Sequence, residues 1–115
     1  MKKIGIKDFK AGDVVTYSQD SLNTVQYTAL VKEYYEEQGV IKELACLCIK
    51  DSTNGDSEGF LWYETALSLY DSYGEIRKAT EEEKQLLIQA IKDDIIDMTR
   101  QELIYKIGEY LPILI

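Results

Sequence analysis

The chain has 115 residues, of which 45% are apolar and 30% charged, and its net charge at pH 7 is −8. These values exclude a disordered chain, and the apolar runs are far shorter than the roughly 20 residues that a membrane-spanning helix needs. We therefore expect one domain over residues 1–115 and no membrane partner. Because no apolar signal core follows Lys2 and Lys3, we expect a cytoplasmic protein.

The acidic excess lies in the second half of the chain. Residues 1–50 have no net charge, whereas residues 51–115 contribute the whole −8. Duplex DNA and RNA are bound by clustered Lys and Arg, so we expect no duplex nucleic acid as a partner. The chain has no His and two cysteines, Cys46 and Cys48, which we interpret as buried thiols in preference to a metal or redox pair. We therefore expect no metal and no cofactor.

The first half of the chain predicts antiparallel strands. Residues 9–17 predict a turn at Gly12 followed by a first strand. A second strand is expected over residues 24–36, which are rich in Tyr, Val and Thr, and a third over residues 40–50. These two strands pair as a hairpin through the turn at residues 37–39. A helix over residues 27–38 is the weaker alternative, because Tyr, Val and Thr are middling helix formers.

The polar stretch of residues 51–59 predicts a hairpin loop. Asn54-Gly55 is one of the commonest hairpin dipeptides, since both residues tolerate positive φ. A calcium loop is the alternative. Its sixth and twelfth positions require Gly and Glu, but this chain has Asp56 and Trp62 there, so the spacing does not support a calcium site.

A fourth strand is expected over residues 60–65 and a short fifth around residues 75–78. Alternation places Phe60 and Trp62 on one face of the fourth strand and Tyr63 on the other. Packing in the core or at an edge is the preferred interpretation of these three residues. The alternative is an exposed platform that stacks bases or prolines, with Phe60, Trp62 and Tyr63 as the candidate binding face.

The last 36 residues predict helices. Thr80 and Glu83 have the spacing of a capping box, and the first helix is expected over residues 81–98. Thr99 and Glu102 repeat this spacing, which favours a second helix over residues 100–110 rather than one bent helix. An apolar stripe is expected to face the sheet, with acidic residues on the water side; the stripe is Leu87, Ala90, Ile91, Ile95 and Met98, and the acids are Asp93, Asp94 and Asp97.

The chain finishes with an apolar segment. We expect it either to fold back against the sheet, which is the preferred interpretation, or to form a homodimer or partner interface through Leu111, Ile113, Leu114 and Ile115. The fold class is α+β, with a β-rich part over residues 1–79 and a helical part over residues 80–115. The β-rich part is a small antiparallel SH3-like barrel or a curled sheet of four to five strands, and two C-terminal helices follow it.

Two short motifs suggest a family. Phe9-Lys10-Ala11-Gly12-Asp13-Val14-Val15 opens the β-rich part, and Arg77-Lys78-Ala79-Thr80-Glu81-Glu82-Glu83-Lys84 opens the helical part. In this combination the chain resembles uncharacterised small proteins of gut Bacteroidetes and their phages. That family implies no activity. Its members commonly finish in a short polar tail after the first helix, whereas this chain continues into an apolar segment.

Two function classes follow from these observations. The leading hypothesis is a non-enzymatic protein-binding module, encoded by a phage or mobile element, that uses its acidic helical half or its apolar tail against a protein partner or a second copy. The alternative is a small β-barrel that binds single-stranded nucleic acid or a small ligand through Trp62 and nearby tyrosines. We do not expect an enzyme, because no two carboxylates are tied by spacing to a shared pocket and no phosphate loop or Ser-centred elbow is present.

Overall fold

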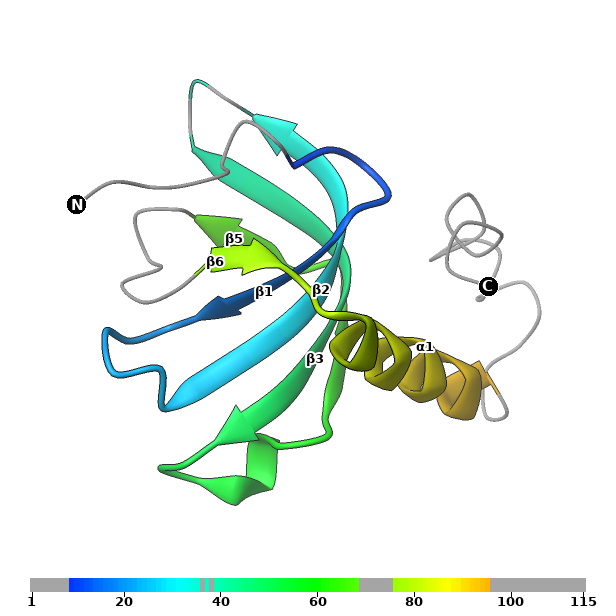
Figure 1. The fold of residues 1–115 in the computed structure, drawn as a ribbon. Helices are drawn as coiled ribbons and strands as arrows, with labels where there is room; N and C mark the ends of the chain where they lie inside the picture. The colour runs from blue at the N-terminus through cyan, green and yellow to red at the C-terminus, as the bar shows by residue number, and fades with distance from the viewer. Residues whose placement is uncertain (1–8, 36, 38, 69–75, 96–115) are drawn as a thin grey trace.

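The structure is a computed structural model that describes residues 9–35, 37, 39–68 and 76–95 (Figure 1). Its elements are β1 (Val14–Ser18), β2 (Val25–Tyr35), β3 (Val40–Asp51), the 3-10 turn η2 (Gly55–Ser57), β4 (Leu61–Tyr63), β5 (Ala66–Ser68), β6 (Ile76–Lys78) and α1 (Glu81–Ile95). The α+β prediction is confirmed, and the helical alternative for residues 27–38 is wrong. The predicted second helix over residues 100–110 lies outside the described residues.

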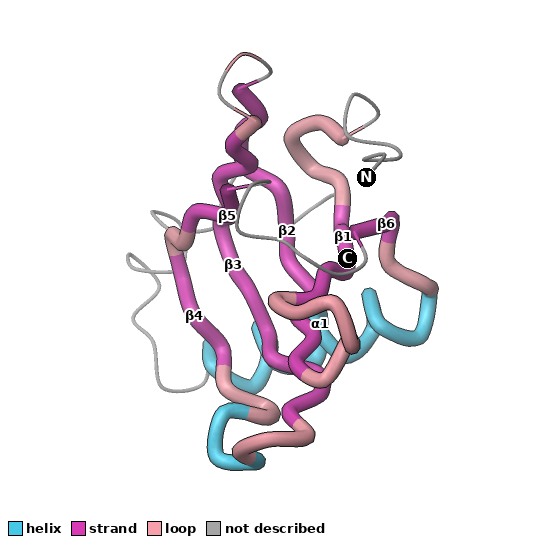
Figure 2. The backbone as a smooth tube through the Cα atoms, turned by 90° about the vertical axis from the view of Figure 1, so that its left-hand side faces the viewer, coloured by secondary structure: helices cyan, strands magenta, loops and turns pink. Residues whose placement is uncertain are grey.

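All six strands belong to one antiparallel sheet with the order β4-β3-β2-β1-β6, and β5 also pairs with β3. The two short strands follow one edge of β3, β4 beside residues 45–47 and β5 beside residues 40–42. Between them Glu64 has a φ of 54°, a backbone conformation that is uncommon for residues other than Gly. Figures 1 and 2 show that β2 and β3 bend along their length, so the sheet curls. The curled-sheet prediction is confirmed, and among the described strands β4 and β6 do not pair to close a barrel.

Bulges bend the hairpin of β2 and β3. Their pairing contains three register shifts, and at one of them Leu30 pairs with Ala45 while Val31 pairs with Glu43. Leu44 is therefore an extra residue in β3, which increases the local bend and redirects side chains. In a regular strand, residues 43 and 46 would point to opposite faces. The bulge brings both to the same face.

The helix α1 packs against the convex face of the curled sheet (Figure 1). Buried apolar side chains fill the space between them, namely Leu30, Leu44, Ala45, Leu47, Leu87, Ile88 and Ile91. Leu87 and Ile91 belong to the predicted stripe. Ile88 is also buried, although the predicted stripe did not include it. The side chain of Ile95 and the whole of Met98 lie outside what the structure describes.

Hydrogen bonds to the Glu83 carboxylate attach the first turn of α1 to the sheet. The predicted capping box is present, because the Thr80 N–H donates to Glu83 Oε1 at 2.9 Å and the Glu83 N–H donates to Thr80 Oγ1 at 3.2 Å. Glu83 also accepts two hydrogen bonds from Arg77 of β6 and one from Thr16 of β1. The Arg77 guanidinium is the main reason that the pKa of Glu83 is lowered to about 2. Glu83 thus joins the helix to two strands.

The loop between β3 and β4 connects a hairpin as predicted, but its turn differs from the expected one. Asn54 has a φ of −153°, which is extended, and its side chain caps η2 by accepting a hydrogen bond from the Asp56 N–H. The Asp51 carboxylate accepts hydrogen bonds from the N–H groups of Thr53 and Asn54 at 3.1 and 2.7 Å. The left-handed residue is Gly59, with a φ of 83°. The predicted Asn54-Gly55 turn is wrong because these side-chain caps organise the loop instead.

Candidate functional site

The concave face of the sheet, opposite α1, gathers three aromatic rings from three strands. Tyr17 of β1 stacks on Tyr27 of β2, with the ring centroids 5.4 Å apart and the planes at 30°. Trp62 of β4 meets Tyr27 edge-on at 5.8 Å and 69°. Both arrangements are favoured by the quadrupoles of the rings. Buried residues of β1, β2 and β3 lie around them, among them Val15, Ala29, Val31, Ile41 and Cys46.

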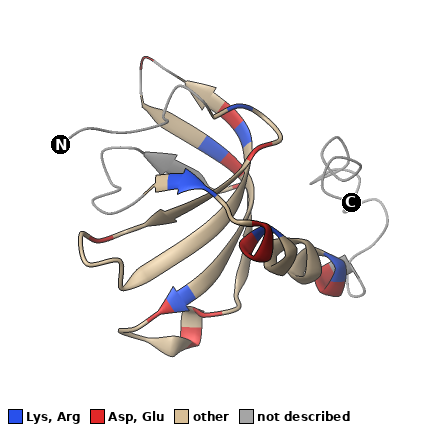
Figure 3. Ribbon diagram, in the orientation of Figure 1, with Lys and Arg blue, Asp and Glu red and all other residues tan. Residues whose placement is uncertain are grey.

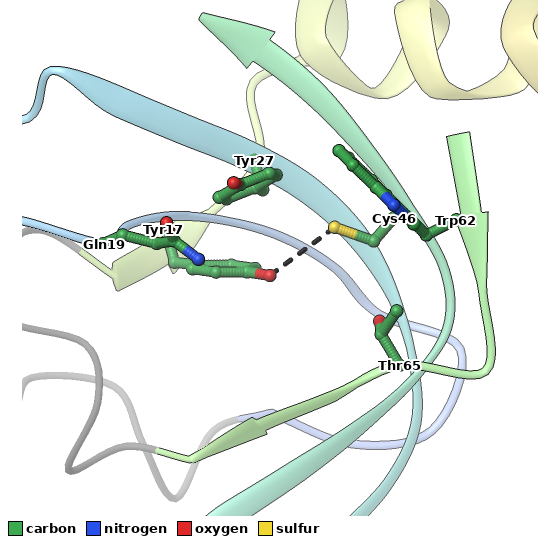
Figure 4. Close-up of a pocket in the computed structure, with 6 residues that line it drawn as sticks. All are labelled: Tyr17, Gln19, Tyr27, Cys46, Trp62 and Thr65. Atoms are coloured by element: carbon green, nitrogen blue, oxygen red, sulfur yellow. Dashed lines mark hydrogen bonds between the residues drawn. The ribbon is translucent and has the colours of Figure 1, made fainter. Parts of the chain in front are cut away.

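A cavity of about 210 Å³ lies beside these rings (Figure 4). We call it the aromatic cavity, and it is lined by Tyr17, Gln19, Tyr27, Cys46, Trp62 and Thr65. Tyr27, Trp62 and Thr65 are half-buried and Gln19 is exposed, so a molecule in solution can reach the cavity. Pockets that hold drug-sized ligands have volumes of about 300–1,000 Å³. The aromatic cavity is smaller and fits a single ring or a short chain.

A buried carboxyl group lies next to this cavity. Glu43 is only 1% exposed, and its Oε2 accepts hydrogen bonds from the Tyr17 hydroxyl at 3.4 Å and from the Thr65 hydroxyl. The Tyr17 oxygen also lies 3.5 Å from Cys46 Sγ, the contact drawn in Figure 4. The other carboxyl oxygen, Glu43 Oε1, is buried without a hydrogen-bond partner among the described residues. A buried polar atom left unpaired costs about 1–3 kcal/mol, and more when it is charged.

Glu43 also lines a second cavity of about 220 Å³, which we call the polar cavity. Its other lining residues are Lys32, Lys42, Glu64 and Thr65. Thr65 therefore lines both cavities, while its hydroxyl donates to Glu43 Oε2. Glu43 is thus hydrogen-bonded to the residue that the two cavities share.

Burial alters the protonation of this cluster. It is the main cause of the raised pKa of the Tyr17 hydroxyl and of the Cys46 thiol, and the nearby Glu43 carboxylate raises the pKa of both further. Burial also raises the pKa of Glu43, against the opposing effect of hydrogen bonds from Thr65, Tyr17 and Cys46. Tyr17 and Cys46 are therefore neutral near pH 7, and a protonated thiol is a poor nucleophile.

The raised pKa of Glu43 predicts a loss of stability with rising pH. Its ordinary value is 4.5. Above this pH the unfolded chain releases the proton while the folded protein still holds it, so the free energy of unfolding falls until the folded-state pKa is passed. We expect Glu43→Gln to remove this decline, which urea unfolding at a series of pH values would measure. An unchanged decline in Glu43→Gln would contradict the prediction.

The structure separates the three residues of the predicted binding face. Trp62 lies on the concave face, and the Phe60 ring, whose residue is 55% exposed, lies 4.9 Å from it. Tyr63 is on the opposite face, where its hydroxyl donates to Asp94 of α1 at 2.5 Å. The three therefore do not form one platform. Asp94 was predicted to face water. This prediction is wrong, because Asp94 is half-buried and its carboxylate accepts the hydrogen bond from Tyr63.

No motif in the sequence pointed to Tyr17, Tyr27 or Glu43 as residues of a site. Tyr17 and Tyr27 become neighbours because they pair directly across β1 and β2. Glu43 had a visible signal, since it is an acidic residue within the largely apolar stretch of residues 40–49. Its position on the concave face depends on the bulge at Leu44, and no local sequence pattern predicts that bulge.

Among the described residues no three His, Cys, Asp or Glu side chains gather to hold a metal ion. None of the described helical residues forms a helix long and apolar enough to cross a membrane. Comparisons with protein-family models, curated proteins and solved structures found no match to this chain. The resemblance to small Bacteroidetes and phage proteins therefore stays a prediction. So does a protein-binding surface or dimer interface at the apolar segment, which lies outside the described residues and comprises Leu111, Ile113, Leu114 and Ile115.

Proposed function

We propose that this protein binds a small molecule in the aromatic cavity. The observation that supports this proposal is the convergence of Tyr17, Tyr27 and Trp62 around a cavity that solvent can reach. Ligand sites typically combine apolar and aromatic walls with a few polar groups that orient the ligand. Gln19 and Thr65 supply such polar groups here.

A small ligand is favoured over single-stranded nucleic acid by the charge around the cavity. Proteins that bind single strands combine stacking rings with a positively charged groove that follows the phosphates. Among the residues that the structure describes, no Lys or Arg lines the aromatic cavity, and β1 and residues 25–31 of β2 carry no charged side chain (Figure 3). The described part of the cavity therefore presents stacking rings without the cations that would bind a phosphate backbone.

The proposal can be tested through the fluorescence of Trp62, which is the only Trp in the chain. We expect single-ring compounds, such as benzyl alcohol and benzylamine, to change its emission in a saturable way. An oligothymidylate of about ten nucleotides, long enough to fill one single-strand site, is expected to leave the emission unchanged. Saturable binding of the oligonucleotide, or no response to any single-ring compound, would overturn the proposal.

Replacing Tyr27 with leucine is expected to weaken the binding of these single-ring compounds about tenfold, because aromatic contacts contribute about 0.5–1.5 kcal/mol beyond burial. Leucine keeps an apolar side chain in β2 but removes the ring that contacts both Tyr17 and Trp62. Titration of each variant, followed through Trp62 emission, gives the affinity.

Tyr63→Phe is the matched control for Tyr27→Leu. Tyr63 is adjacent to Trp62 in β4 but lies on the face that packs against α1. Its substitution removes the hydrogen bond to Asp94 and is expected to leave the affinity unchanged. An equal loss of affinity in both variants would show that the aromatic cavity does not hold the ligand.

A further inference from the structure

Three side chains that line the aromatic cavity use their hydroxyl or thiol hydrogens in a buried cluster around Glu43. The carboxyl group of Glu43 accepts hydrogen bonds from the Tyr17 hydroxyl at 3.4 Å and from the Thr65 hydroxyl. The Cys46 thiol is a further hydrogen-bond partner of the same carboxyl group. Each of the three groups carries one hydrogen. Because that hydrogen is used within the cluster, none of the three has a hydrogen left to donate to a ligand.

Thr65 is the member of this cluster that a ligand reaches most easily. It is half-buried, whereas Tyr17 and Cys46 are 6% and 3% exposed, and its side chain lies beside the Tyr17 hydroxyl at the wall of the cavity (Figure 4). A hydroxyl oxygen that has donated its hydrogen still has lone pairs that can accept. A proton on Glu43 would occupy Oε1, which has no partner among the described residues, so Oε2 accepts from Thr65 in both protonation states. Toward the cavity, the Thr65 hydroxyl is therefore a hydrogen-bond acceptor.

The described residues that line the aromatic cavity carry no charge near pH 7. Gln, Trp and Thr side chains do not ionise, and burial raises the pKa of the three lining groups that can, which are Tyr17, Tyr27 and Cys46. An ionised ligand would lose its hydration in the cavity without a counter-charge among these residues, and unpaired burial of a charge is costly. The cavity therefore favours an uncharged ring compound.

We infer that the ligand is an uncharged single-ring compound that carries a hydrogen-bond donor, such as a phenolic O–H. The inference rests on the proposed function. The ring lies against Tyr27 and Trp62, and its O–H donates to the Thr65 oxygen. Glu43 does not touch the ligand and is a positioning residue, because it accepts the Thr65 hydrogen and so fixes this hydroxyl as an acceptor. A ligand that can only accept finds no donor at Thr65.

Phenol and anisole form a matched pair of probes, because they share the ring and its oxygen but only phenol can donate. We expect the wild-type protein to bind phenol about tenfold more tightly, measured through Trp62 emission excited where neither probe absorbs. Thr65→Val keeps nearly the same shape without the hydroxyl, and the preference is expected to fall below about threefold. Thr65→Ser keeps the oxygen and is expected to keep the preference.

Gln19→Ala is the matched control for Thr65→Val. Gln19 also lines the cavity, and its amide can both donate and accept, but the residue is exposed, so water competes for these hydrogen bonds. Its removal is expected to leave the preference for phenol unchanged. Loss of the preference in Gln19→Ala would place the deciding polar group at Gln19 and overturn the inference.

The outcomes separate this inference from the proposed function. If no single-ring compound binds, the proposed function fails, and the inference fails with it. The inference is overturned, while the aromatic cavity remains a binding site, if the wild type binds anisole as tightly as phenol or benzylamine at least as tightly as benzyl alcohol. Loss of the preference in Thr65→Ser overturns it as well. Where Thr65→Val does not fold, Thr65→Cys offers sulfur, a weaker acceptor, and is expected to lower the preference. An unchanged preference in whichever of these two variants folds overturns the inference.

Discussion

Replacing Glu83 with alanine is expected to lower the free energy of unfolding by about 2–3 kcal/mol. The carboxylate accepts hydrogen bonds from the Thr80 N–H at 2.9 Å, from the Thr16 hydroxyl at 2.8 Å and from the two Nη atoms of Arg77 at 2.7 and 2.9 Å. Its side chain is 16% exposed, and its pKa falls from 4.5 to about 2. Each pKa unit corresponds to about 1.4 kcal/mol, and partial screening by water reduces the sum.

The pH dependence of this effect has a definite sign. A carboxyl group whose folded-state pKa is lowered stabilises the fold fully above its unfolded pKa of 4.5, and this contribution is lost as the pH falls toward about 2. The difference between wild type and Glu83→Ala in urea unfolding should therefore be largest near neutral pH and shrink in acid. Glu83→Gln keeps an acceptor for the Thr80 N–H but loses the charge, so an intermediate effect is expected.

The neighbouring residue provides the control for Glu83. Glu82 is exposed in the same first turn of α1, so Glu82→Ala removes one favourable interaction with the helix dipole and is expected to cost less than about 1 kcal/mol. Equal losses in the two variants would show that the effect of Glu83 comes from the dipole alone. A Glu83→Ala effect that does not change with pH would also contradict the predicted role of the carboxylate.

Local sequence signals correctly predicted the elements that are determined by residues close together in the chain. The hairpin of β2 and β3 follows from two runs of strand-forming residues around Gly39, whose φ is 63°. The start of α1 follows from Thr80 and Glu83, which form the predicted capping box. Each of these signals involves residues within a few positions of one another, so the chain alone shows them.

The candidate site depends on relations between distant residues. Tyr17 and Trp62 come together through Tyr27 because the register of β1, β2, β3 and β4 aligns them. Glu43 reaches the concave face through the extra residue at Leu44, and a bulge of this kind leaves no reliable mark in the sequence. Strand alternation placed Trp62 and Tyr63 on opposite faces, but it did not show which face α1 would cover.

The position of α1 on the convex face leaves the concave face without a helix among the described residues (Figure 1). The helix buries its apolar side chains against the convex face, with Leu87 fully buried and Ile91 1% exposed. The aromatic cavity on the other side therefore has no described helix over it (Figure 1). Any change that detaches α1 should destabilise the sheet on which the cavity is built.

Two adjacent leucines test this coupling between helix and sheet. Leu87 is fully buried against β2 and β3, whereas Leu86 is 50% exposed. Leu87→Ala is expected to lower the free energy of unfolding by about 3–4 kcal/mol, because it removes buried apolar surface and leaves a cavity. Leu86→Ala makes the same chemical change in the same helix and is expected to cost less than about 1 kcal/mol.

Because the helix and the sheet share one core, far-UV circular dichroism and Trp62 fluorescence should report the same shifted transition. A Leu87→Ala variant in which the helix signal is lost before the Trp62 signal changes would show that the sheet stands without α1.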